Sequence, residues 1–224
     1  PQGIACQNIY GCGYFAVYGD WRVECTLGLF HEMDFGFDYY APQSFADESG
    51  RRIQIGWMGM PDADYGNAPT VAHGWQHCFT VPRMLTKGEN GTLLQNPVPE
   101  LAARRGPAQK LASGVEVRVA PCFDLTAAPA GDFALTVAHG VELVYTEKDS
   151  TCTLRFTDAS MADGRTARHA KLTGPCRSVR VVADRSSLEI FLNDGAAVLS
   201  TRYYPAPGDV AVKMAGADAV VYSL

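Results

Sequence analysis

The feature that most constrains the fold is a series of short apolar segments that starts at Leu111 and runs to the C-terminus. Turn-forming residues separate successive segments, a spacing that is typical of a two-sheet β-sandwich. We therefore predict an all-β fold with a β-sandwich domain over residues 111–224. The expected strands are 115–119, 122–126, 133–137, 141–145, 151–156, 177–183, 188–192, 197–203, 209–214 and 219–222.

The strongest hairpin signal within this region follows residues 187–192. Leu188, Ile190 and Leu192 share one face, and Asn193, Asp194 and Gly195 supply turn chemistry. Three carboxylates lie nearby, at Asp184, Glu189 and Asp194. We interpret them as turn and surface residues rather than catalytic ones, because Glu189 is expected on the face opposite the core and Asp194 lies in the turn.

Residues 1–96 also have a β pattern. The segment 14–18 is apolar and aromatic between glycines, as a strand should be. The stretch 34–60 is predicted to be a hairpin, because isoleucines alternate with polar residues over 52–55 and a polar break precedes them. Residues 74–83 are predicted to form the next strand.

The predicted hairpin carries the candidate binding residues Asp38, Tyr40 and Trp57, which are expected close together at strand ends. A carboxylate can accept two sugar hydroxyls, and an aromatic face can cover the apolar C–H side of a sugar ring. The alternative is that Tyr40 and Trp57 are core aromatics and Asp38 caps a turn. Composition alone leaves both interpretations open.

Two further acidic residues, Asp62 and Asp64, lie in the loop that follows. Loops at strand ends often carry function, so these side chains are candidates for a pocket rim, with a solvated loop as the alternative. Nothing in the loop predicts a general acid and base on opposite sides of a bond.

The segment 97–110 has the pattern of a linker that contains one short helix. Pro99 is favourable in the first turn of a helix, and Glu100 is favourable near the positive N-terminal end of the helix dipole. Arg104 and Arg105 are favourable near the negative C-terminal end, and Gly106 is a typical residue for ending a helix. We place the domain boundary here.

Composition excludes several classes of partner. The net charge is −5 with no basic block, which argues against nucleic acid and against an anionic membrane surface. There is neither a long apolar run nor a signal-like start. Pro1, Gln2 and Gly3 open without an initiator Met, which is expected of a piece of a longer protein.

Seven cysteines are present, an odd number without a CxxC pair. Free thiols in a reducing cytoplasm explain this pattern better than a zinc site or a disulfide framework. His73 and His77 are four residues apart, a spacing that would bring them together on a helix. The segment is predicted to be a strand, in which that spacing does not bring them together, so no metal site is predicted.

Four sequence motifs, in order and spacing, resemble glycoside hydrolase family 32, the invertases and sucrose-6-phosphate hydrolases, and most nearly the intracellular bacterial type. The run Val179–Gly195 also resembles the sandwich signature of this family. The four motifs are FDYYAPQSF at 37–45, IGWMG at 55–59, GWQHC at 74–78 and VPRML at 81–85.

The resemblance implies that residues 1–96 are the last blades of a five-bladed β-propeller, joined by 97–110 to a C-terminal β-sandwich. It implies no metal or cofactor, and it implies that Trp75 and Arg83 are structural because their segment packs the last blade. Tyr40 would be a pocket residue that bonds a catalytic carboxylate or the sugar, Asp38 would orient it or bind a hydroxyl, and Trp57 would help to form the apolar wall.

The family's three catalytic motifs are absent from the sequence. They are a Trp-Met-Asn-Asp-Pro-Asn-Gly motif with the nucleophile, an Arg-Asp-Pro motif, and a Glu-Cys-Pro-Asp motif with the acid/base glutamate. Glu24-Cys25 resembles the start of the last, but Thr26 and Leu27 follow it and Asp38 comes too soon after it. We therefore identify no catalytic residue.

The implied parent reaction is hydrolysis of sucrose or sucrose 6-phosphate by a retaining β-fructofuranosidase, and this chain alone is expected to be inactive. The alternative is a stand-alone carbohydrate-binding or interaction module. An incomplete propeller leaves a sheet edge and an apolar face uncovered, which predicts self-association or binding of the missing N-terminal portion.

Overall fold

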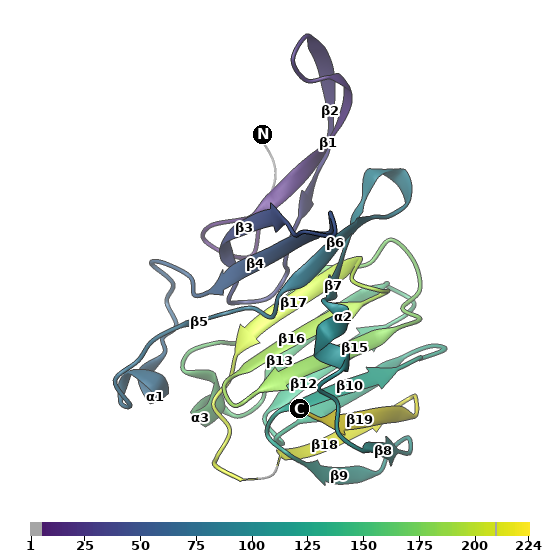
Figure 1. Cartoon of the computed structure of the whole chain (residues 1–224). Coiled ribbons are helices and arrows are strands. Elements are labelled where there is room, and N and C mark those ends of the chain that lie inside the picture. The colour runs from purple at the N-terminus through teal and green to yellow at the C-terminus, as the bar shows by residue number, and fades with distance from the viewer. Residues whose placement is uncertain (1–5, 209) are drawn as a thin grey trace.

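The computed structural model describes residues 6–208 and 210–224. Pro1, Gln2 and Gly3, and Asp209 at the start of one expected strand, lie outside these residues. The described chain is built from β-strands with a few single-turn helices, so the all-β prediction is confirmed. Figure 1 shows a large double-layered region that carries a smaller sheet and a projecting hairpin.

The C-terminal region is a sandwich of two antiparallel sheets, each with six described strands. The first sheet has the order β17-β16-β15-β10-β19-β8 and the second the order β14-β13-β12-β11-β18-β9. Their bounds are β8 (Ala108–Leu111), β9 (Glu116–Val119), β10 (Phe123–Ala127), β11 (Phe133–Val137), β12 (Val141–Thr146), β13 (Thr151–Phe156), β14 (Ala167–Lys171), β15 (Val179–Asp184), β16 (Ser187–Leu192), β17 (Ala197–Arg202), β18 (Val210–Ala215) and β19 (Ala219–Ser223).

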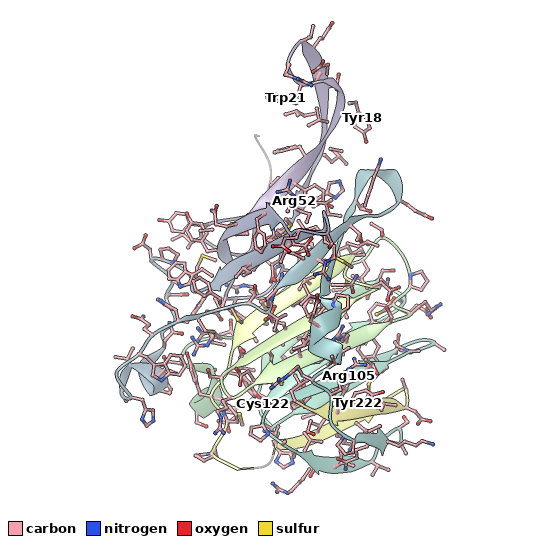
Figure 2. All side chains as sticks on the ribbon, in the orientation of Figure 1. Tyr18, Trp21, Arg52, Arg105, Cys122 and Tyr222 are labelled. Carbon is pink, nitrogen blue, oxygen red and sulfur yellow. The ribbon has the colours of Figure 1, made fainter. Side chains whose placement is uncertain are left out.

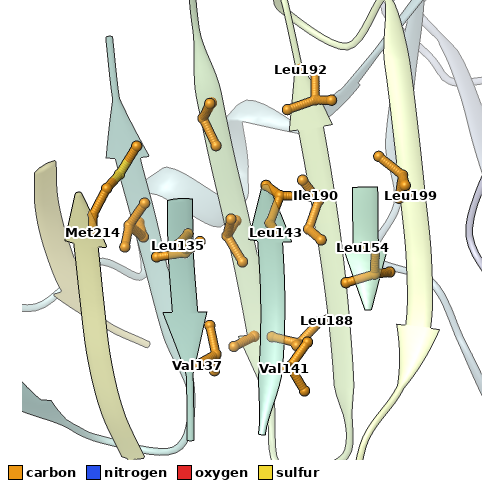
Figure 3. Close-up of a cluster of buried hydrophobic side chains, with 14 of the residues drawn as sticks. Leu135, Val137, Val141, Leu143, Leu154, Leu188, Ile190, Leu192, Leu199 and Met214 are labelled. Carbon is orange, nitrogen blue, oxygen red and sulfur yellow. The ribbon is translucent and has the colours of Figure 1, made fainter. Parts of the chain in front are cut away.

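The main hydrophobic core fills the space between these two sheets. Leu135 and Leu143 come from one sheet and Ile190 and Leu199 from the other, and their side chains meet in the interior (Figure 3). Alternate residues of β11 and β12 are buried, the period that the sequence predicted. Full burial of one such side chain stabilises a fold by roughly 1.5–3 kcal/mol, so this core is the main source of stability.

The N-terminal region consists of a two-stranded hairpin and a separate antiparallel sheet. The hairpin of β1 (Gly13–Asp20) and β2 (Glu24–Glu32) projects away from the rest of the chain, with Tyr18 and Trp21 near its tip (Figure 2). The sheet has the order β3-β4-β6-β7, with β5 paired to β4. Its strands are β3 (Tyr40–Ala46), β4 (Arg52–Met58), β5 (Cys78–Phe79), β6 (Arg83–Lys87) and β7 (Leu93–Pro97).

The helical elements of the described chain are short. They are α1 (Ala68–Val71), the 3₁₀ turn η1 (Glu89–Gly91), α2 (Pro99–Ala102) and α3 (Ala159–Ala162). The helix expected after Pro99 is present as α2.

The prediction of one strand over residues 74–83 is wrong. Only β5 and the first residue of β6 are strand there, because Gly74 and His77 both have positive φ angles, of 81° and 64°, which interrupt an extended chain. The strand β14 was not predicted from the sequence, because only Ala170 of its five residues is apolar and buried.

The edge strand β17 is covered by the chain that enters β3. The N–H groups of Phe35 and Asp38 donate to the carbonyl oxygens of Val198 and Ser200, at 2.8 Å and 3.0 Å. In return, the side chains of Asp34 and Asp38 accept the N–H groups of Ser200 and Arg202, both at 2.8 Å. This pairing satisfies the free edge of the sandwich and fixes the smaller sheet against it.

The seven cysteines are free thiols, as predicted, with Cys152 and Cys176 buried and Cys25 exposed. No helix within residues 6–208 and 210–224 has the length and apolar character needed to cross a bilayer.

Candidate functional site

An aromatic wall forms where β3 begins and β4 ends, beside the loop that precedes β1. Tyr40 lies opposite Trp57 across the two strands, and the ring centroids are 6.3 Å apart. Tyr10 packs 5.6 Å from Tyr40, and His77 meets the indole of Trp57 edge-on at 4.6 Å. We call Tyr10, Tyr40, Trp57 and His77 the aromatic wall. These side chains are only partly buried, so the wall can contact a ligand.

Local backbone features aim the wall residues. The strand register shifts between Tyr40 and Gln43, and Ala41 has a φ of 44°, so a bulge follows Tyr40 and turns its side chain. A Cβ at Gly59 would lie 2.6 Å from the Trp57 ring and 2.9 Å from the His77 ring. Gly59 therefore allows the indole and the imidazole to close over the backbone.

The electrostatic state of the wall follows from its surroundings. Burial, and then the positive charge of Arg202, lowers the pKa of His77, so this imidazole is neutral near pH 7. Tyr10 donates a 2.7 Å hydrogen bond to Asp62, and this bond raises the pKa of the phenol. The wall and the neighbouring Asp62 thus offer aromatic rings and one fixed carboxylate, a combination suited to a polyhydroxylated ligand.

Asp38 is not in the wall, although Tyr40 follows it by two residues. Its side chain is fully buried, and Arg165 donates to its two oxygens from Nε at 2.7 Å and Nη2 at 2.8 Å. Arg165 also donates to the carbonyl oxygen of Gly66 and to Asn67. The carboxylate of Asp38 therefore connects the sandwich to the strand of Tyr40 and to the loop after β4.

A second buried ionic network lies deeper in the same junction. Arg83 is fully buried and donates to Glu189 at 2.7 Å, to Asp34 at 3.1 Å and to Ser200 at 2.6 Å. The N–H of Val81 donates to Glu189 at 2.6 Å. This network joins β6 to β16 and β17 of the sandwich.

The interpretation of Glu189 as a surface carboxylate is wrong. It lies on the face of β16 opposite the sandwich core, as expected, but only 2% of it is exposed. The smaller sheet covers that face of β16. The alternation of residues within β16 cannot indicate that a second sheet packs there.

The acidic loop after β4 lies next to the wall. Asp62 and Asp64 line a polar pocket of about 340 Å³ together with Asn8, Tyr65 and Arg168. Arg168 donates to Asn8 at 2.8 Å and lies 4.0 Å from the ring centroid of Phe37. The two carboxylates therefore rim a pocket that one guanidinium partly neutralises.

The other sequence candidates lie apart from the wall. Glu24 is exposed at the first residue of β2, by the turn of the projecting hairpin. Asp184 and Asp194 are exposed. Sequence reasoning missed Tyr10, which lies in a loop without a motif, and Arg165, which follows α3. No local signal identifies either, because their roles depend on contacts with distant segments.

Comparison with known proteins identifies the family of the chain. Residues 1–97 match the model of the glycosyl hydrolases family 32 N-terminal domain, and residues 89–222 match the model of the family 32 C-terminal domain. Among curated relatives, the sucrose-6-phosphate hydrolases of Bacillus subtilis and Klebsiella pneumoniae are 36% and 38% identical over 93% and 94% of the chain. The chain spans only 46% and 45% of the length of these two relatives.

Solved structures agree on the fold. A sucrose-6-phosphate hydrolase from Lactobacillus gasseri superposes with a TM-score of 0.86 at 22% identity, covering 98% of this chain and 49% of that one. A Bombyx mori GH32 β-fructofuranosidase in complex with sucrose gives a TM-score of 0.82 at 23% identity, covering 100% of this chain and 49% of that one.

The fold defines the class: an all-β architecture in which a smaller sheet is joined to a β-sandwich. Within that class, the chain belongs to glycosyl hydrolase family 32. The family prediction from the sequence motifs is confirmed.

Proposed function

We propose that the complete protein is a retaining β-fructofuranosidase that hydrolyses sucrose or sucrose 6-phosphate, and that this chain supplies one wall of its pocket. The observation that carries the proposal is the aromatic wall, in which Tyr40 and Trp57 lie opposite each other across two strands and remain partly exposed. The names of the matched relatives, and the sucrose complex of one of the similar structures, support the same substrate class.

In this proposal residues 1–96 are the last blades of a five-bladed propeller, 97–110 the linker and 111–224 the sandwich, whose first strand, β8, already begins at Ala108 within the linker. A retaining glycosidase needs two carboxyl groups roughly 5 Å apart, one to attack the anomeric carbon and one to protonate the leaving oxygen. The wall contains no such pair among its described residues, so the nucleophile and the acid/base belong to the part of the relatives that this chain does not match. The chain alone is then inactive.

Two wall residues, and Asp38 behind the wall, have defined roles. The indole of Trp57 covers the apolar side of the sugar, and the hydroxyl of Tyr40 donates to the sugar or to the catalytic carboxylate. Asp38 acts indirectly, because its oxygens are bonded to Arg165 and to the N–H of Arg202. We assign it to positioning Tyr40 rather than to binding a sugar hydroxyl.

The test is a chimaera in which this chain replaces the matching segment of the Bacillus subtilis relative. The chain alone should release no fructose from sucrose or sucrose 6-phosphate, whereas the chimaera should. In the chimaera, Trp57→Ala and Tyr40→Phe should each lower kcat/KM by about tenfold or more, equivalent to about 1.4 kcal/mol of transition-state stabilisation.

Tyr222→Phe is the matched control, because Tyr222 lies in the sandwich beneath Arg105 (Figure 2). Its kinetics should equal those of the parent chimaera. Full activity of both wall variants would remove Tyr40 and Trp57 from the site. Fructose release by the isolated chain would mean that it contains its own nucleophile.

A further inference from the structure

A second pocket, separate from the aromatic wall, lies between the α1 segment and the sandwich. Its volume is about 510 Å³. Thr70, His73 and Trp75 contribute from the α1 side, and Arg185, Ser186 and Tyr204 from the sandwich side. We call it the junction pocket. It shares no lining residue with Tyr10, Tyr40, Trp57 or His77.

The polar lining of the junction pocket can carry positive charge. Arg185 is exposed and forms no ion pair within the described part of the chain, and His73 is also exposed. Asp and Glu are absent from the described lining, although the whole chain has a net charge of −5. The adjacent carboxylate of Asp184 accepts from the N–H of Arg185 and from the thiol of Cys122. An exposed guanidinium without an ion pair among the described residues can bind an anionic ligand.

A second cation, Arg202, lies behind the residues that line the pocket. Arg202 is fully buried and donates from Nε and Nη2 to the carbonyl oxygen and hydroxyl of Ser186, at 2.8 Å and 3.0 Å. Its guanidinium carbon lies 5.2 Å from the ring centroid of Trp75 and 5.6 Å from that of Tyr204. Its third nitrogen, Nη1, is buried and has no hydrogen-bond partner in the described residues. Arg202 is not itself a lining residue, so its charge acts on a ligand in the pocket only through its field.

The junction pocket also offers an aromatic platform. Trp75 remains 46% exposed while Arg202 lies against its ring. The hydroxyl of Tyr204 is committed to Asn67 at 2.7 Å, so its ring is held in place. A fixed, exposed indole can cover the apolar C–H face of a sugar, and Arg185 can bind a phosphate oxygen pair.

We propose that the junction pocket binds a phosphorylated monosaccharide, with the sugar ring on Trp75 and the phosphate on Arg185. His73 and the field of Arg202 support the phosphate. The site lies wholly within this chain and requires no catalytic carboxylate, so it does not depend on the proposed hydrolase activity.

The test is calorimetric titration of the 224-residue chain with glucose 6-phosphate, glucose, inorganic phosphate and AMP at constant pH and ionic strength. Glucose 6-phosphate should bind most tightly, because only it combines a sugar face with a dianion. Arg185→Ala and Trp75→Ala should each weaken it at least tenfold, and Arg185→Lys and Trp75→Phe should retain part of the affinity. Circular dichroism checks that the variants are folded.

Matched controls are Arg104→Ala and Trp21→Ala, which remove an exposed arginine and an exposed tryptophan elsewhere. Both should bind glucose 6-phosphate as the parent chain does. The proposal is overturned if glucose 6-phosphate does not bind, if glucose, phosphate or AMP binds as tightly, or if the pocket variants and the controls behave alike.

Discussion

Asp38 and Arg165 are 127 residues apart in the sequence, yet the guanidinium of Arg165 binds both carboxylate oxygens of Asp38 at 2.7 Å and 2.8 Å. Their side chains are 1% and 0% exposed. The pair therefore joins the turn after α3, which carries Arg165, to the segment that leads into β3, which carries Asp38 and Tyr40. The sandwich therefore does more than extend the fold, because it fixes the strand that carries the candidate wall.

Arg165→Met should strongly destabilise the chain. It leaves the carboxylate of Asp38 buried without its cation, and loss of one partner of a buried pair costs roughly 3–5 kcal/mol. Urea denaturation followed by circular dichroism measures the change. Arg155→Met is the control, because Arg155 pairs with Glu142 at the surface, with 52% and 27% of the side chains exposed. It should cost less than about 1 kcal/mol, and equal losses for both variants would contradict the role given to the buried pair.

Gly36→Ala should loosen the smaller sheet from the sandwich. A Cβ there would lie 2.0 Å from the carbonyl oxygen of Ser200, so the chain that covers β17 must shift. Such overpacking costs typically 1–3 kcal/mol. Gly174→Ala, where a Cβ meets no atom within 4 Å, should leave the unfolding midpoint unchanged. Hydrogen exchange of the Ser200 amide measures whether the contact between the covering chain and β17 has loosened. Unaltered protection of this amide in Gly36→Ala would contradict the prediction.

Glu32 should make stability depend on pH. Burial, and then the charge of Asp34, raises its folded-state pKa to about 7, against the ordinary value of 4.5 expected in the unfolded chain. The folded state therefore holds a proton that the unfolded chain releases. This contribution is complete below about pH 4.5 and is lost as the pH rises to about 7.

The comparison is between the parent chain and Glu32→Gln in urea at pH 5 and pH 8. The parent should lose on the order of 1 kcal/mol more than the variant over this range, after allowance for the partial exposure of Glu32. Glu48→Gln, an exposed carboxyl in the turn after β3, should behave as the parent does. The same loss in Glu32→Gln would assign the pH dependence to another group.

The projecting hairpin should drive self-association of the isolated chain. Trp21, Val23 and Leu29 are 74%, 85% and 82% exposed, and β1 and β2 pair only with each other in the described chain (Figures 1 and 2). Exposed apolar strands bind other chains. Sedimentation velocity should show concentration-dependent association that Val23→Lys with Leu29→Lys reduces. Val115→Lys, at a 50% exposed site in the sandwich, should not reduce it. A monomer at every concentration would contradict the prediction.

Much of the sandwich could be predicted from the sequence. The expected strands 133–137 and 151–156 coincide with β11 and β13, because alternation and flanking turns are properties of the local chain. The hairpin that pairs Tyr40 with Trp57 also formed as expected. By contrast, β14 carries Arg168, His169 and Lys171 and has no apolar period, so pairing with β13 alone makes it a strand.

By itself, the sequence determined the all-β class, the family and the pairing of two aromatic residues, since each depends on patterns read within a few residues or on ordered motifs. Only the tertiary structure decided that Asp38 and Glu189 are buried in ion pairs with Arg165 and Arg83. Burial and charge pairing across more than one hundred residues depend on how one sheet covers another. No local period records that contact.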